Sequence, residues 1–129
     1  METQMNLPLL FAAWLCVVLG LIHSILGEYL IFRHLRKGNL APTIPAPPLK
    51  ERHIRILWAS WHIVSLFGWT IAAILFVYTY APAPLQSVTL AACAIGCLSS
   101  GLLVLYATQG KHPGWIALTV IGLLIYLSQ

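Results

Sequence analysis

The last 74 residues of this 129-residue chain carry one formal charge, Lys111. A soluble domain has about a quarter of its residues charged, and these cover its surface. The whole chain is 60% hydrophobic and 8% charged, which excludes an ordinary soluble domain. It also excludes a disordered chain, because disorder combines low hydrophobicity with high charge. We therefore predict an integral membrane protein whose main contact is the lipid bilayer.

Four apolar segments are candidates for membrane helices: residues 7–32, 56–81, 85–107 and 114–128. About 20 apolar residues cross the hydrocarbon core of a bilayer, so only the fourth segment has little margin. Prolines and glycines between the segments favour helix ends, and the short later connections favour antiparallel neighbours. The prediction is an all-α, polytopic membrane protein of one domain, built as an antiparallel bundle of four transmembrane helices.

The basic residues predict how the chain is oriented. Six of the seven Lys and Arg residues lie in the proline-rich loop at residues 33–55, and the seventh, Lys111, lies between the last two segments. Basic loops stay in the cytoplasm, so both termini are predicted to be periplasmic, as in a bacterial inner-membrane protein. A nucleic-acid partner is not expected, because it would need basic residues spread over a folded face.

The first apolar segment has two distinct faces at 100° per residue. The small and polar residues on one face are Cys16, Gly20, His23, Ser24, Gly27 and Glu28. The bulky residues on the other face are Leu15, Val18, Leu19, Ile22, Ile25, Leu26 and Tyr29. We expect the small and polar face to contact protein and the bulky face to contact lipid.

The third segment carries small residues at a spacing of four. One row is Ala92, Gly96 and Ser100, and the next is Cys93, Cys97 and Gly101. Small residues at this spacing let membrane helices approach closely. The segment is therefore predicted to be the central packing helix, with its cysteines as packing residues rather than metal ligands.

Two histidines lie within the first two apolar segments. His23 precedes Arg33 by ten residues and His62 follows Arg55 by seven, so at about 1.5 Å per residue their depths below the two arginines are similar. Two imidazoles at matching depth on neighbouring helices could hold one metal ion or one haem. The alternative is that each histidine only forms hydrogen bonds across the helices.

Residues around the histidines fit the same hypothesis. Gly20 and Gly27 would let a planar macrocycle approach the backbone, and Trp58 and Trp69 could pack against it. The predicted cofactor is therefore haem b or a transition metal bound by the two histidines. The histidine pair resembles that of b-type membrane cytochromes. Tryptophans near segment ends are also frequent interface anchors, which is the competing interpretation.

Glu28 is the only acidic residue inside a predicted span. An unpaired carboxylate is costly in a membrane, so we expect it to be protonated or paired, with Arg55 as its natural partner. The pair could simply join the first two helices, or the carboxylate could bind a proton or act as the counter-charge of a substrate. The chain length, the four-helix plan and the glutamate in the first helix are similar to small multidrug-resistance transporters, although Glu28 lies nearer the cytoplasmic end.

No nucleophile elbow, P-loop, dinucleotide fingerprint or HExxH helix occurs in the sequence, so it leaves open whether the chain is an enzyme. Three functional hypotheses remain. The chain binds haem or a metal between its first two helices, near the cytoplasmic side. Alternatively, it is a small proton-coupled transporter that uses Glu28 and works as a homo-oligomer, or a non-catalytic subunit of a larger membrane complex. The matching histidine depths and the flanking aromatic residues favour the first.

Overall fold

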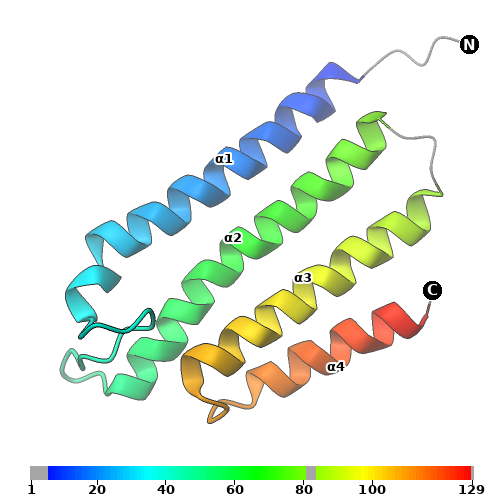
Figure 1. The fold of residues 1–129 in the computed structure, drawn as a ribbon. Helices are drawn as coiled ribbons and strands as arrows, with labels where there is room; N and C mark the ends of the chain where they lie inside the picture. The colour runs from blue at the N-terminus through cyan, green and yellow to red at the C-terminus, as the bar shows by residue number, and fades with distance from the viewer. Residues whose placement is uncertain (1–5, 81–83, 129) are drawn as a thin grey trace, which may run out of the picture.

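The computed structural model describes residues 6–80 and 84–128, which are helical with connecting turns and loops and contain no strand. The four α-helices are α1 (Leu7–Leu30), α2 (Glu51–Tyr80), α3 (Leu85–Thr108) and α4 (Gly114–Leu127), and a short 3-10 helix, η1 (Phe32–Leu35), follows α1 (Figure 1). The all-helical prediction is confirmed. Three helices, α1, α2 and α3, are long and apolar enough to cross a membrane, which indicates a membrane protein.

The ends of the helices differ from the ends of the predicted apolar segments mainly beside the charged loop at residues 33–55. Helix α1 ends at Leu30, and α2 begins at Glu51, five residues before the expected start. The early start has a physical cause, because Glu51 and Arg55 form an i,i+4 ion pair and an acidic residue is favourable in a first helical turn. The expected end of the second segment, Ala81, lies outside the described residues.

The helices form an antiparallel row in chain order (Figure 1). Helix α1 packs on α2, α2 on α3, and α3 on α4, and these neighbours account for nearly all helix-to-helix contacts among residues 6–80 and 84–128. A bundle closed around one shared core is therefore not formed by the described part of a single chain. The consequence is a thin layer of helices with two broad faces.

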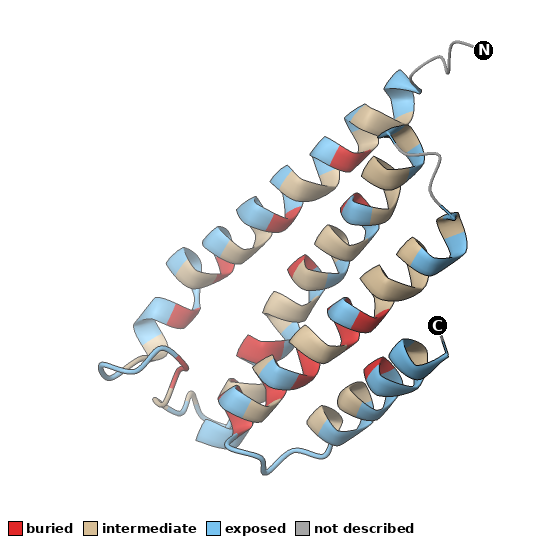
Figure 2. Ribbon diagram, turned by 45° about the vertical axis from the view of Figure 1, so that its right-hand side comes forward, coloured by how far each residue is buried: buried red, intermediate tan, exposed pale blue. Residues whose placement is uncertain are grey.

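The expected protein-facing side of α1 is confirmed. Gly20 and Gly27 are buried, whereas the bulky residues of the opposite face are all exposed (Figure 2). Ala13, on the buried side, has no exposed surface. An apolar face left exposed by the protein is the expected lipid-facing surface of a membrane helix.

Helix α3 is an internal member of the row, as its small residues predicted. A side chain added at Gly96 would overlap Thr70 of α2, and one at Gly101 would approach Thr119 of α4 to 2.8 Å. The two small-residue rows therefore bring α3 close to both of its neighbours. Its cysteines are free thiols.

Candidate functional site

Three side chains hold the Glu28 carboxylate where α1 meets the first turns of α2. Its Oε1 accepts a hydrogen bond from Trp58 Nε1 at 2.5 Å and lies 2.9 Å from His62 Nε2. Its Oε2 forms an ion pair with the guanidinium of Arg36. The side chains of Glu28 and His62 are 29% and 16% exposed. The site is thus a partly buried charge cluster that joins α1, α2 and the loop after η1.

The expected ion pair between Glu28 and Arg55 is not formed. Arg55 Nε donates to Glu51 Oε1 at 2.8 Å, and its Nη1 donates to the carbonyl oxygen of Ala107 at 3.1 Å. Arg55 therefore ties α2 to the end of α3. Arg36 replaces it beside Glu28, because the chain folds back after α1 and η1.

A continuous chain of hydrogen bonds leads from Glu28 to the backbone of α1, and one arrangement of protons satisfies all of its contacts at once. Ser65 Oγ donates to the carbonyl oxygen of Gly20 at 2.9 Å, so it must accept from Ser24 Oγ at 2.8 Å. Ser24 has then used its only proton and must accept from His62 Nδ1 at 2.9 Å.

This arrangement determines which proton can join His62 Nε2 to Glu28 Oε1. With a proton already on Nδ1, a second proton must lie between Nε2 and the carboxylate to make this contact a hydrogen bond. The pair then exists either as imidazolium and carboxylate or as neutral imidazole and carboxylic acid. In both forms the two side chains hold one exchangeable proton between them.

His23 and Trp61 form a second, reciprocal link between α1 and α2. Trp61 Nε1 donates to the carbonyl oxygen of His23 at 2.9 Å, and His23 Nε2 donates to the carbonyl oxygen of Trp61 at 3.2 Å. The two rings stack, with centroids 4.4 Å apart and planes 8° from parallel. His23 is therefore fixed by α2, but through Trp61 and not through His62.

Indole rings occupy the space beside the two glycines. Trp69 lies against Gly20 and donates to the carbonyl oxygen of Val17 at 3.2 Å, and Trp61 lies against Gly27. The glycines thus admit tryptophan side chains at the positions where a macrocycle was expected.

The histidine nitrogens do not suit one shared ion in this arrangement. His62 uses both ring nitrogens, on Ser24 and Glu28, and His23 Nε2 carries the proton that it donates to a carbonyl oxygen. Across the described ranges, no group of three or more His, Cys, Asp or Glu side chains could hold a metal ion. The haem or metal hypothesis remains a prediction that this geometry does not favour.

A groove of about 420 Å³ opens beside the carboxylate. Its lining residues are Ser24, Ile25, Glu28, Tyr29, Arg33 and Arg36. The Arg33 guanidinium lies 3.8 Å from the centre of the Tyr29 ring, as a cation–π contact. The proton-holding pair therefore borders an accessible surface lined by two cationic side chains.

Sequence reasoning missed Arg36 and Trp61. At 100° per residue, Trp61 lies only 40° beyond Ser65 on α2, so a wider face would have included it. A second signal was the small residue Gly27 on α1, which leaves room for a ring. No helical pattern could have found Arg36, because a loop positions it.

Comparisons of the chain with protein-family models, with curated proteins and with solved structures gave no match.

Proposed function

We propose that the chain is a small proton-coupled membrane transporter that works as a homo-oligomer, with Glu28 and His62 holding the coupled proton. The observation that carries the proposal is the proton count of the hydrogen-bond chain. That count leaves one exchangeable proton on a carboxylate–imidazole pair inside an apolar helix pair. An ionisable residue within a membrane span is a functional candidate by default.

Loss of the shared proton would weaken the contact between α1 and α2. Without it, the Nε2 lone pair of His62 and the Oε1 of Glu28 are two acceptors that face each other at 2.9 Å. Two acceptors repel, so the contact between α1 and α2 is weakened at this point. The carboxylate keeps Arg36 and Trp58 as partners. Proton release into the adjoining groove is thereby linked to helix separation.

The homo-oligomer is proposed because the described residues form an open row of four helices, which does not surround a pathway. A second copy placed on one face of the row would complete a bundle, as expected from the sequence, and would line a pathway on both sides. The basic loop between α1 and α2 and Lys111 support a cytoplasmic location for this end of the helices. We accordingly propose periplasmic termini and a bacterial inner membrane.

Glu28→Gln is the variant that tests the proposal. Glutamine keeps the size of the side chain and an oxygen that can accept from Trp58 Nε1, but its amide has no proton to release to the groove. In proteoliposomes with pyranine inside, an acid step outside and the membrane potential clamped, we expect the wild type to acidify the lumen faster than lipid-only vesicles. Glu28→Gln should fall to the lipid-only rate, whereas the matched control Glu51→Gln should keep the wild-type rate.

Two probe ions are added in turn, tetraphenylphosphonium and chloride, because the groove contains both a carboxylate and arginines. Two results would contradict the proposal. The first is a wild-type rate of lumen acidification equal to that of lipid-only vesicles in all three conditions, without a probe, with tetraphenylphosphonium and with chloride. The second is normal proton transport by Glu28→Gln. A monomer in mild detergent would contradict the homo-oligomer. Stoichiometric partner proteins would instead favour a subunit of a larger complex.

The same preparation tests the cofactor hypothesis. A Soret band or stoichiometric metal that is lost in His62→Ala would establish haem or metal binding and would displace the proton-coupled proposal as the role of His62. The hydrogen bonds of both His62 nitrogens lead us to expect neither signal.

A further inference from the structure

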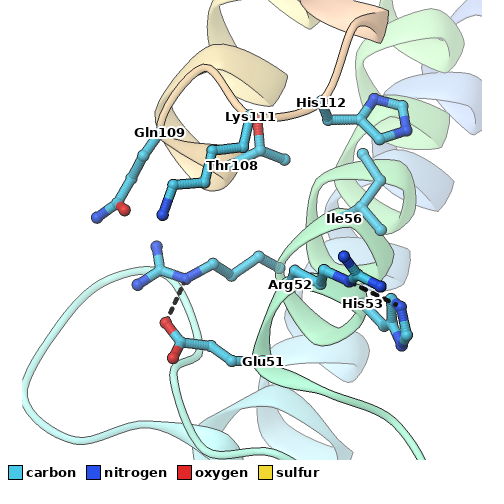
Figure 3. Close-up of a pocket in the computed structure, with 9 residues that line it drawn as sticks. Glu51, Arg52, His53, Ile56, Thr108, Gln109, Lys111 and His112 are labelled. Atoms are coloured by element: carbon cyan, nitrogen blue, oxygen red, sulfur yellow. Dashed lines mark hydrogen bonds and ion pairs between the residues drawn. The ribbon is translucent and has the colours of Figure 1, made fainter.

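A second polar cavity, of about 480 Å³, lies away from Glu28, between the first turns of α2 and the turn that joins α3 to α4 (Figure 3). Its lining residues are Glu51, Arg52, His53, Arg55, Ile56, Thr108, Gln109, Lys111 and His112. None of them belongs to the hydrogen-bond chain of the proton-holding pair. The inference drawn from this cavity is therefore independent of the proposed function.

The turn after α3 brings its polar side chains over α2. Gln109 is left-handed, with φ of 53°, and Gly110 follows with φ of 75°. These two residues reverse the chain, so that Gln109, Lys111 and His112 all line the side facing α2 (Figure 3). Gly114 N donates to His112 Nδ1 at 3.1 Å, which leaves His112 Nε2 as a donor.

Positive charge dominates the cavity. It contains three cations, Arg52, Arg55 and Lys111, and one carboxylate, Glu51, which is already paired with Arg55. Among the described residues, the Lys111 ammonium forms no ion pair or hydrogen bond. Arg52 Nε donates to the neutral ring of His53 at 3.2 Å, so the positive charges of Arg52 and Lys111 both remain without a carboxylate partner among the described residues. Arginine and lysine side chains with further N–H donors are the groups that bind phosphate oxygens.

The location of the cavity adds a second argument. It lies at the helix ends beside the loop that collects most of the charges of the chain, which is where a membrane surface would lie. We propose that the cavity binds a phosphate group, supplied either by the headgroup of an anionic phospholipid or by free phosphate. Lys111 binds the oxygens directly, Arg52 contributes its positive charge from the side of His53, and Arg55 holds α2 against α3 through the carbonyl oxygen of Ala107 (Figure 3).

The test uses the full chain, purified in a neutral detergent and stripped of lipid. One arm titrates dioleoylphosphatidylglycerol, with dioleoylphosphatidylcholine as the neutral lipid, and a second arm titrates inorganic phosphate, with thermal unfolding as the readout. Lys111→Gln and Arg52→Gln should each weaken the apparent affinity about fivefold, as expected for one cation at a membrane surface. Lys37→Gln, a basic residue outside the cavity, should leave it unchanged.

The two arms separate the sources of the phosphate. Stabilisation by phosphatidylglycerol alone assigns a lipid headgroup, stabilisation by phosphate alone assigns the free ion, and both together support the shared chemistry. The proposal is overturned if neither ligand stabilises the wild type. It is equally overturned if Lys37→Gln weakens binding as much as Lys111→Gln, since the effect would then come from the charge of the whole loop. Far-ultraviolet circular dichroism confirms that each variant is folded.

Discussion

Replacing Glu28 with alanine should lower the free energy of unfolding by about 2–3 kcal/mol, the largest effect that we expect from a single side chain. The substitution leaves three groups without their shared partner: the Arg36 guanidinium, the Trp58 indole and the His62 imidazole. This loss of unfolding free energy is smaller than the loss expected on breaking a fully buried ion pair, because the Glu28 side chain is 29% exposed. Equilibrium unfolding by sodium dodecyl sulfate in mixed micelles measures it.

Glu51→Ala is the matched control. Glu51 also pairs with an arginine, but through an i,i+4 contact on one helix, and its side chain is 49% exposed. Such a pair contributes about 0.3–0.5 kcal/mol. If the two alanine variants unfold at the same detergent fraction, the Glu28 cluster does not stabilise the contact between α1 and α2.

Gly27→Ala should be the second most damaging change, at about 1–3 kcal/mol. The added Cβ would overlap the pyrrole edge of Trp61, including Nε1. The indole cannot move away cheaply, because Nε1 donates to the carbonyl oxygen of His23 at 2.9 Å and the ring stacks on the His23 imidazole. The variant must therefore either separate α1 from α2 or break this link. The unfolding midpoint and tryptophan emission report the two outcomes.

Gly68→Ala provides the comparison for that variant. A Cβ at Gly68 would meet only the carbonyl oxygen of Cys16, at 3.9 Å, which is ordinary van der Waals contact. Alanine is also the better helix former by about 1 kcal/mol, so stability should stay the same or rise slightly. A Gly27→Ala protein as stable as Gly68→Ala would show that Trp61 is free to rearrange.

Local chemistry made most of the fold predictable. The sorting of α1 into a small, polar face and a bulky face depends only on helical periodicity, and the protein-facing side lies as expected. The small residues of α3, such as Gly96 and Gly101, likewise identified a helix with close neighbours on two sides. The first residue of α2 was harder to predict, because its first turn is charged. Hydropathy identifies the apolar stretch of a helix and not the residue at which the helix begins.

The candidate site was only partly predictable, and its missing members have a common cause. Glu28 and His62 were identified because each is polar within an apolar span. Arg36 was missed because only the path of the loop brings it to Glu28, and Arg55 was assigned to Glu28 on reach along the helix alone. The open row was missed for a similar reason. Periodicity tells which face of a helix is buried, but not whether a fourth helix returns to the first.

The length of α2 has a consequence for how the molecule is seated in lipid. Its 30 residues extend about 45 Å, against a hydrocarbon core of about 30 Å. Even with its charged first turn in the headgroup region, the apolar remainder is longer than that core, and a helix accommodates such an excess by tilting. Because the neighbouring helices run alongside it, a tilt of α2 would tilt the whole row with it (Figure 1). A thinner bilayer would increase that tilt, so membrane thickness should set the depth at which the proton-holding pair lies.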